Sequence, residues 1–263
     1  MSECKDRVLG TLLGLAAGDR IGGPVRMARR VAESLHDQGR FDALDIGRRY
    51  LEWWREGAFD TGPTTAQVLS LVASGASFEQ ALICVDERLG EMTAGCNPAH
   101  RIAPLAMYRS LDDVALASAA IAEARLTHRH PIAGEIAAVV ASLCRALIRG
   151  VSWTNALEVC VVGRGLEARC AVAIPRVGEL SLGGFAPEVL RSAIYFLNDA
   201  DSLSAALARS IEFAGPENYC PVLVGSIGGA RWGCSQIAAE ALWHHGDLVP
   251  RLTAAGIALA REW

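Results

Sequence analysis

Apolar residues recur at helical spacing along most of this chain. In residues 131–150 they fall three or four positions apart, which places them on one face of an α-helix. This segment also has a proline where a helix can begin and a glycine where it can end. The same spacing is found in residues 113–125, from residue 187 onward, and in residues 235–244. Only residues 172–182 carry a weak pattern of extended structure, so the sequence predicts an all-α fold.

Three of the expected helices begin with a serine that is followed four residues later by Ala-Leu. These serines are Ser77, Ser152 and Ser202. A serine hydroxyl at this position can accept hydrogen bonds from free backbone N–H groups, and Gln80 adds capping-box spacing to the first case. The unequal intervals argue against a repeat architecture. No linker divides the chain, and we expect one compact multi-helix domain over residues 1–263.

Two segments carry glycine at every fourth position. They contain Gly10, Gly14 and Gly18 near the N-terminus, and Gly225, Gly229 and Gly233 in the last quarter of the chain. Glycines at this spacing leave a smooth strip on one face of a helix, because no side chain projects from them. We therefore expect the two segments to form helices that pack closely against each other.

Charge and composition favour a small-molecule ligand over nucleic acid or membrane. The 263 residues carry a formal net charge of −4, with 51% hydrophobic and 21% charged residues. No basic stripe offers nucleic acid or an anionic membrane surface a binding face. No uninterrupted apolar run reaches the roughly 18 residues expected of a membrane span.

Cysteine usage and the N-terminal segment predict a cytoplasmic protein. The eight cysteines include no Cys-x-x-Cys pair, and most stand in apolar helical sequence, which is typical of reduced and buried thiols. Residues 8–17 form an apolar run that is similar to a signal peptide. However, Glu3 and Asp6 dilute the positive charge before the run, and glycines interrupt it. We therefore expect no cleaved leader.

Two acidic positions stand at helix ends in the first quarter of the chain. Asp19 follows the first glycine-spaced segment, where a carboxylate is either solvated or functional. Asp60 precedes hydroxyl residues, including Thr61 and Thr64, that lead into another predicted helix. These side chains either cap the helix N-terminus or offer oxygen ligands to a cation or a substrate hydroxyl.

A loop rich in glycine and proline brings together Asn97, His100 and Arg101. The arginine suits either a phosphate group or an ion pair with a carboxylate such as Asp19. A histidine beside an arginine is disfavoured as a cation. We therefore expect His100 to be a neutral hydrogen-bonding group.

A second polar loop, Glu217, Asn218 and Tyr219, comes directly before the second glycine-spaced segment. If the two glycine-spaced helices pack together, these residues stand at the mouth of that contact. A further pair, His128 and His130, has a spacing that can bind a metal ion. Because a proline follows immediately, a helix-capping turn is the favoured interpretation of this pair.

Five segments in order resemble the ADP-ribosylglycohydrolase family, whose founding activity removes ADP-ribose from an arginine of dinitrogenase reductase. They are LGTLLGLAAGDRIGG, similar to the opening helix; AGCNPAHRIAPLA, similar to a Gly-Asn-Gly-Ala-Ala-Met-Arg-Ile-Ala-Pro loop; LTHRHPIAGEIAAVV, similar to a Thr-His segment; LGGFAPEVLRSAIYFL; and the closing glycine helix. The resemblance covers nearly the whole chain. It implies an all-α fold around a central cleft and a binuclear magnesium or manganese site that positions water against an anomeric carbon.

The segments that resemble the family's metal-binding runs lack their aspartates. A Thr-Asp-Asp-Thr run falls on residues 61–64 and a Gly-Asp-x-Asp-Thr run on residues 215–219, and all four aspartates are replaced. Two divalent ions held close together need several anionic oxygens to offset their repulsion. Asp60 and Glu217, which lie close to the lost positions, are the remaining candidates to hold an ion. We therefore expect one Mg²⁺ or Mn²⁺ ion, or none, and not a conventional binuclear site.

The resemblance implies a hydrolase that cleaves an N- or O-ribosyl bond of a ribosyl or nucleotide-like small molecule. Asp60 or Glu217 would orient or deprotonate the water, because a nearby carboxylate stabilises an oxocarbenium-like state. The residues expected to bind substrate are Asp19, Asn97 and Asn218 at the ribose hydroxyls, His100 or Arg101 at a phosphate or base, and Thr61, Thr64 and Tyr219 around them.

Two alternatives remain open because a fold does not determine a function. One is a non-catalytic protein that binds ADP-ribose or a nucleotide, and the other is a lyase or transferase that uses the same cleft. For assembly, the Trp53-Trp54 pair and Trp263 leave room for a homodimer interface, since large aromatic side chains that face solvent often mark such surfaces.

Overall fold

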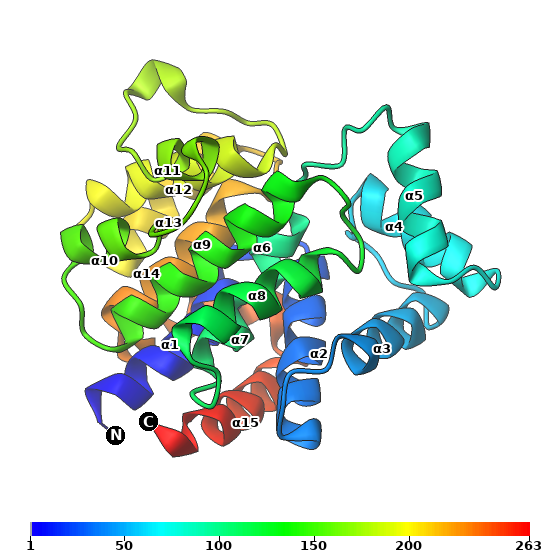
Figure 1. The fold of residues 1–263 in the computed structure, drawn as a ribbon. Helices are drawn as coiled ribbons and strands as arrows, with labels where there is room; N and C mark the ends of the chain where they lie inside the picture. The colour runs from blue at the N-terminus through cyan, green and yellow to red at the C-terminus, as the bar shows by residue number, and fades with distance from the viewer. Residues whose placement is uncertain (1) are drawn as a thin grey trace.

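A computed structural model describes residues 2–263, and that part of the chain is helical without a β-strand (Figure 1). The prediction of an all-α fold is confirmed. Three helices form its centre: α1 (Glu3–Gly18), α9 (Pro131–Ile148) and α14 (Cys220–Trp232). The two ends of the chain lie on the same side of the molecule, where the C-terminal turn contacts α1.

The two glycine-spaced segments pack against each other as predicted. α1 and α14 make the most extensive contact between any two helices, and they run antiparallel. A methyl group on Gly14 would overlap the carbonyl oxygen of Gly225, and one on Gly10 would overlap that of Gly229. The backbones therefore touch directly, which only glycine permits.

Helix α9 is the most apolar helix of the core. By length and composition it would suffice to cross a membrane, with a mean hydropathy of 1.7 over 18 residues, but 83% of that window is buried inside the protein. It packs against α8 (Asp113–Ala124) and α14. Burial against these helices accounts for its apolar character, because a helix that is apolar all round is stable only when it is surrounded.

The remaining helices cover this centre. On one side lie α2 (Gly23–Gln38), α6 (Asn97–Arg101), α7 (Ala103–Met107) and α15 (Val249–Leu259), and on another α10 (Trp153–Val159), α11 (Leu166–Ala171), α12 (Ala186–Asn198) and α13 (Leu203–Ala214). Short 3₁₀ turns are η1 (Val177–Glu179), η2 (Cys234–Gln236), η3 (Ala239–His245) and η4 (Ala260–Glu262).

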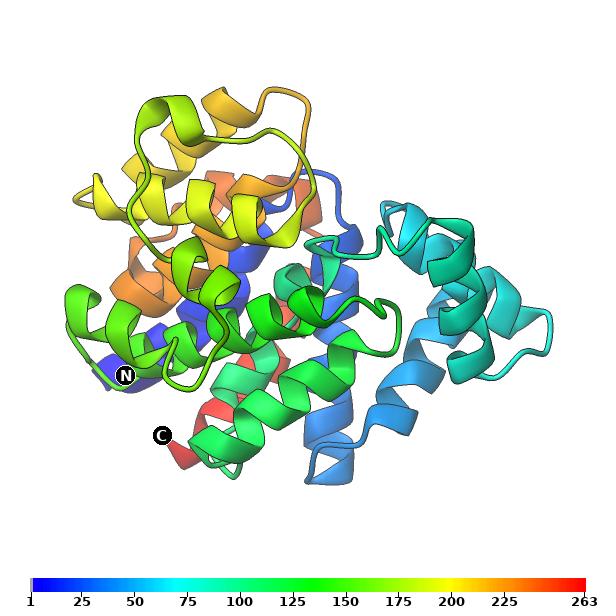
Figure 2. The same ribbon diagram turned by 45° about the horizontal axis from the view of Figure 1, so that its top comes forward.

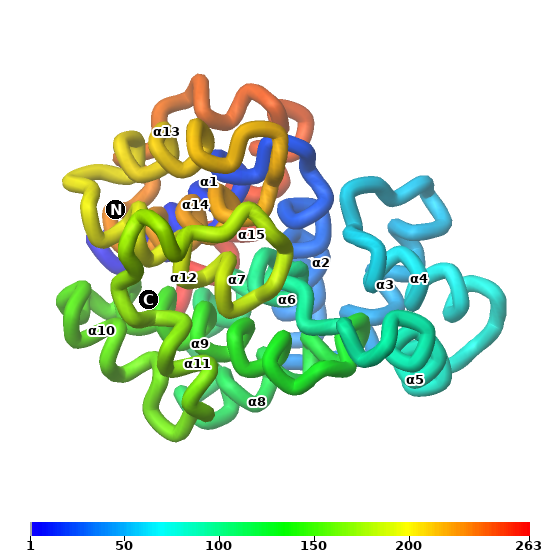
Figure 3. The backbone as a smooth tube through the Cα atoms, turned by 90° about the horizontal axis from the view of Figure 1, so that it is seen from above, coloured from blue at the N-terminus to red at the C-terminus, as the bar shows by residue number. Residues whose placement is uncertain are grey.

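Helices α3 (Ala43–Arg55), α4 (Pro63–Ala73) and α5 (Phe78–Arg88) project beyond α2, as Figures 2 and 3 show. α4 and α5 have a small apolar cluster of their own, separate from the main core; its buried members are Val68, Val72, Ala81 and Val85. The N-terminal end of α4 faces back toward the main body, and the candidate site lies there.

Local signals at helix starts are confirmed. The hydroxyls of Ser77, Ser152 and Ser202 each accept a hydrogen bond from the backbone N–H three residues on, and Gln80 completes a capping box with Ser77. The helices predicted in residues 113–125 and from residue 187 are present as α8 and α12.

Three expectations are wrong. Residues 172–182 form a loop with one 3₁₀ turn and no strand, and residues 235–244 form 3₁₀ turns instead of an α-helix. Trp53 is 4% exposed and packs in the core, so it offers no surface for a partner. The side chain of Trp263 also turns inward, since its Nε1 donates a 2.7 Å hydrogen bond to the carbonyl oxygen of Met107.

Candidate functional site

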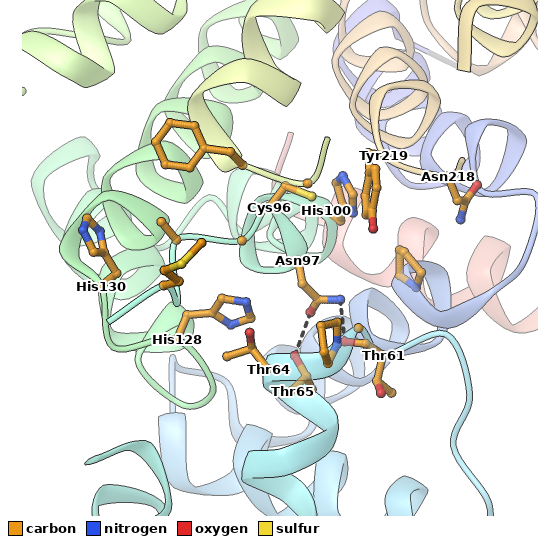
Figure 4. A pocket seen from close by; sticks show the side chains of 18 of the residues that line it. Thr61, Thr64, Thr65, Cys96, Asn97, His100, His128, His130, Asn218 and Tyr219 are labelled. Carbon is orange, nitrogen blue, oxygen red and sulfur yellow. Dashed lines mark hydrogen bonds between the residues drawn. The ribbon is translucent and has the colours of Figure 1, made fainter. Parts of the chain in front are cut away.

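A pocket of about 490 Å³ lies between the start of α4 and the main body. A pocket of this size suits a small organic ligand. Seven of the ten predicted site residues line it: Asp60, Thr61, Thr64, Asn97, His100, Asn218 and Tyr219. The loops that carry them are far apart in sequence, and the packing of α4, α6 and α14 brings them together (Figure 4).

Asn97 connects the two sides of the pocket. Its Nδ2 donates a 3.2 Å hydrogen bond to the carbonyl oxygen of Thr61, and its Oδ1 accepts one of 3.4 Å from Thr65 Oγ1 (Figure 4). Arg101 Nη1 donates to the same Oδ1 at 2.6 Å. The start of α4 is thereby joined to α6 across the floor of the pocket.

Arg101 is fully buried behind this floor and does not line the pocket. Its Nε donates a 2.6 Å hydrogen bond to Glu123 Oε1, which also accepts one of 2.6 Å from the hydroxyl of Tyr50. Burial alone lowers the pKa of Arg101, but Glu123 outweighs that effect and the net shift is upward. Of the two predicted roles for Arg101, the ion pair with a carboxylate is the one that the structure shows. The partner is Glu123 and not Asp19. Arg101 is not placed to contact a phosphate group of a ligand in the pocket.

Asp19 is also buried outside the pocket lining. Its carboxylate accepts backbone hydrogen bonds of 2.8 Å from Gly22 and Val25, and one of 2.7 Å from Asn218 Nδ2. These bonds anchor the first turn of α2, where a negative charge is favourable. The geometry therefore gives Asp19 a structural position and not the predicted contact with ribose.

Asp60 is the predicted catalytic carboxylate that does line the pocket. Its Oδ2 accepts a 3.1 Å hydrogen bond from the backbone N–H of Gly23 and lies 3.5 Å from Asn218 Nδ2. Burial raises the pKa of the Asp60 carboxyl above its ordinary value, and the negative charge of Asp19 adds to this. Its φ of 51° is in the left-handed region that few residues other than glycine adopt. Such strain is concentrated at functional sites.

Glu217, the second predicted catalytic carboxylate, is exposed outside the pocket lining. Its backbone carbonyl accepts a hydrogen bond from Arg20, which also binds the carbonyl of Gly215 at 2.7 Å. The next residue, Asn218, faces inward instead. Glu217 is therefore not placed to share an ion with Asp60 or to act on a ligand in this pocket.

His100 and Tyr219 lie side by side on one wall (Figure 4). Their rings are stacked, with centroids 6.4 Å apart and planes 25° apart. Burial lowers the pKa of His100 to about 3, and the charge of Arg101 contributes to the shift, so the predicted neutral state is supported. The Nε2 atom of His100 is buried and has no hydrogen-bond partner among the described residues.

His128 also lines the pocket, and its role differs from that of His130. Its Nδ1 lies 2.9 Å from Thr127 Oγ1, and that oxygen accepts a 2.8 Å hydrogen bond from Arg101 Nη2. Nδ1 of His130 accepts a 3.2 Å hydrogen bond from the N–H of Ile132, which caps α9. The capping interpretation is therefore confirmed for His130.

Several lining residues escaped the sequence analysis. Glu91, Met92, Cys96 and Phe185 all face the pocket. Burial raises the pKa of the Cys96 thiol, which disfavours the thiolate. No local pattern distinguishes Glu91, whose backbone φ of 63° appears only in the structure. Phe185 reaches the site because Gly95 and Phe185 form an isolated bridge between distant loops.

Residues 25–261 match the sequence profile of the ADP-ribosylglycohydrolase family. The chain belongs to this family. It is 22% identical over 284 residues to the ADP-ribosylarginine hydrolase Tri1 of Pseudomonas putida (strain GB-1), with 90% of this chain and 74% of that protein covered. A solved structure described as an ADP-ribosylglycohydrolase-related protein complex is 26% identical, with a TM-score of 0.81 and 99% of both chains covered.

ADP-ribosylglycohydrolases generally depend on divalent cations, but the donor set in this pocket does not fit a binuclear centre. Asp60 and Glu91 are its only acidic lining residues among those described, and no group of three His, Cys, Asp or Glu side chains in residues 2–263 is placed to hold an ion. The Asn218 amide directs its N–H donors at Asp19 and Asp60. Magnesium-type ions need anionic oxygen ligands at that place, and not hydrogen-bond donors.

Proposed function

We propose that this chain is a glycoside hydrolase that cleaves an N- or O-ribosyl bond, with Asp60 as the carboxylate that activates water. The observation that carries the proposal is the position of the Asp60 carboxylate in the pocket, together with its backbone conformation and its raised pKa. It is a pocket-lining carboxylate in a strained conformation, with a pKa raised by burial. A carboxylate whose pKa moves toward neutrality is a better proton acceptor at physiological pH.

In the proposed reaction the water oxygen forms a bond to the anomeric carbon of the ribose. The bond from that carbon to the leaving nitrogen or oxygen breaks, and its electron pair stays with the leaving atom. Asp60 accepts one proton from the water, the leaving atom takes up one proton from solvent, and Asp60 then returns its proton to solvent, so that the net change is the addition of one water molecule across the bond. The negative charge of Asp60 also stabilises the positive charge that develops on the sugar.

The neighbouring groups would position the sugar. Thr64 and Asn97 lie on the pocket wall where hydroxyl groups of a ribose could meet neutral hydrogen-bonding partners. Because the donor set does not suit two ions, we derive no step that depends on a metal. We also place the reaction in the cytoplasm, in agreement with the cysteine pattern of the sequence.

The test compares the wild-type protein with Asp60→Asn on ADP-ribosylarginine and on a panel of nucleosides, with Asp201→Asn at the surface as the matched control. We expect Asp60→Asn to lower kcat by about 100-fold or more, since removal of a general base has effects of this order. Ligand binding should persist, because asparagine tolerates the positive φ.

Equal rates for Asp60→Asn and the wild type would contradict the assignment of Asp60. A wild-type protein that binds these compounds but releases no product from any of them would favour the binding-protein alternative instead.

A further inference from the structure

We propose that this protein forms a homodimer through an apolar face built by α10, α11 and the residues that follow α11. This surface, the α10–α11 face, comprises residues 153–177. None of these residues lines the candidate site, so the inference stands independently of the proposed function.

Exposed large apolar side chains gather on the α10–α11 face. Five of the fifteen on the described residues fall within this short stretch: Val159, Val162, Leu166, Ile174 and Val177. Leu166 is 76% exposed and Val162 is 74% exposed. Single exposed apolar residues are normal on a protein surface, but a cluster of them marks a site of interaction.

A groove of about 540 Å³ runs between α10 and α11, which lie side by side in Figures 1 and 3. Leu157 on α10 and Leu166 on α11 line it, and Ile174 lines it beyond the end of α11. Val161, next to the exposed Val162, is also part of its wall. The groove and the exposed side chains therefore belong to one continuous surface.

The two helices make their main contacts inward. α10 packs against α9, and α11 packs against α9 and α12. Both helices are short, with seven and six residues. Helices of this length gain little stability from their own hydrogen bonds, so burial of their outer sides would add to the packing that holds them in place.

The apolar area of the face matches what a homodimer needs. A standard interface buries about 800 Å² on each partner, and about 65% of a homodimer interface is apolar, which is roughly 500 Å². The five exposed aliphatic side chains and the groove between them offer apolar surface on the order of 500 Å².

The charged side chains of the face are of both signs. Glu158 and Arg169 line the groove, and Glu167 and Arg176 are exposed beside it. None of these four takes part in a salt bridge within residues 2–263. In a two-fold dimer each patch meets its own copy, so acidic groups of one protomer can pair with basic groups of the other.

This charge pattern favours a second copy of the chain over other occupants. An anionic membrane or a nucleic acid attracts a surface with excess positive charge, and here the two arginines are balanced by two glutamates. Contact of the face with itself buries the apolar side chains and leaves both signs of charge with partners.

The test is sedimentation velocity of the full chain at protein concentrations from about 1 to 100 μM, which covers the affinity expected of a modest interface. We expect the wild type to change from monomer to dimer over this range. Leu166→Glu places a charge in the apolar contact and should raise the dissociation constant by about 100-fold or more. Val162→Glu, in the turn between the helices, should act in the same direction.

Leu44→Glu is the matched control, because Leu44 is 81% exposed on α3 and away from the face. It should dimerise as the wild type does. All three substituted positions are exposed, so melting temperatures at low protein concentration should agree with that of the wild type. A wild type that stays monomeric over the whole range, or a dimer that Leu166→Glu leaves intact, would overturn the proposal.

The free thiol of Cys170 gives a second measurement. Cys170 is exposed and lines the groove, so a second copy would cover it. Its rate of reaction with excess maleimide should fall about 5-fold or more as the protein concentration rises through the dimer range. The rate at Cys84, on α5, should not change with concentration. Equal Cys170 rates in monomer and dimer would show that the dimer uses another surface.

Charge reversal tests the pairing across the two-fold axis. Arg169→Glu leaves the face with acidic groups in excess and should raise the dissociation constant by about 10-fold at low salt, less at 1 M salt. Arg55→Glu, the same change at an exposed position of α3, should leave it unaltered. An unchanged constant in Arg169→Glu would contradict the charge argument.

A last measurement separates a second copy from a membrane. The wild type should not co-sediment with vesicles that contain phosphatidylserine. Vesicle binding that is lost in Leu166→Glu, by a protein that remains a monomer in solution, would assign the face to a membrane and overturn the homodimer.

Discussion

Nδ2 of Asn218 donates a 2.7 Å hydrogen bond to Oδ1 of Asp19. The same atom lies 3.5 Å from Oδ2 of Asp60, so one amide group stands between two carboxylates. The other end of the amide is also used, because Asn218 Oδ1 accepts a 3.0 Å hydrogen bond from the N–H of Arg20. Two carboxylates that face each other need a cation, a shared proton or a hydrogen-bond donor between them. In this chain the donor is Asn218.

The first prediction follows from this arrangement. Asn218→Asp replaces the donor by a third carboxylate, and we expect the free energy of unfolding at pH 7 to fall by about 2 kcal/mol, because buried acceptors lose their partner and gain a repulsive neighbour. Added Mg²⁺ or Mn²⁺ should restore at least half of the loss by binding the new acidic cluster. Thermal unfolding with and without each ion measures both effects.

Asn155→Asp, at an exposed position, is the control for the Asn218 variant. Its free energy of unfolding should equal that of the wild type, and added Mg²⁺ or Mn²⁺ should not change it. Stability of Asn218→Asp that equals that of the wild type would contradict the bridging role of the amide.

The second prediction concerns the pH dependence of stability. Burial raises the pKa of folded Asp60 above its unfolded value, so the folded protein holds this proton more tightly than the unfolded chain. Ionisation of Asp60 therefore costs stability as the pH rises above about 4. Asp60→Asn removes that cost, and the variant should melt about 2 °C above the wild type at pH 7.

The difference in melting temperature should shrink as the pH is lowered toward 4, because the wild-type carboxyl then becomes protonated. Asp201→Asn, at an exposed position, is the matched control. An advantage of Asp60→Asn that grows at low pH would have the wrong sign for a raised pKa.

A third prediction tests the buried ion pair behind the pocket. Arg101→Met leaves the carboxylate of Glu123 buried without its cation, and we expect a loss of about 3–5 kcal/mol in urea unfolding. Replacing both partners by methionine should cost less than the sum of the two single changes, because no uncompensated charge remains.

The exposed pair of Arg149 and Asp113 is the comparison for Arg101. Arg149→Met should cost about 1 kcal/mol or less, as surface ion pairs do. Similar losses for Arg149→Met and Arg101→Met would show that burial is not what makes the inner pair important.

The fourth prediction concerns the contact between α1 and α14. Gly225→Ala places a methyl group against the carbonyl of Gly14, where neither backbone can move far, and we expect a loss of about 3 kcal/mol or more in denaturant unfolding. Gly178→Ala is the control, since that residue is exposed, has open space around it and does not adopt a positive φ. The control should be neutral or slightly stabilising. A neutral Gly225→Ala would contradict the direct backbone contact.

The features that sequence analysis predicted correctly are those that depend on local spacing. Helical periodicity, the serine caps and the two glycine-spaced segments each need only a few neighbouring residues to be recognised. The same spacing failed at residues 235–244, because an apolar pattern there is compatible with both α-helical and 3₁₀ turns, and contacts with the rest of the chain select between them.

At the site, too, local sequence patterns predicted some features, and contacts with the rest of the chain decided others, even between neighbouring residues. The sequence alone, through its local patterns and its family resemblance, determined which loops gather at the pocket and that their acidic ligands are replaced. Only the tertiary structure decided that Asn218 faces inward while Glu217 is exposed, that Asp19 serves α2, and that Arg101 pairs with Glu123. The reason is physical: a buried polar group must be paired, and its partners come from helices whose relative positions are set by packing across the whole chain.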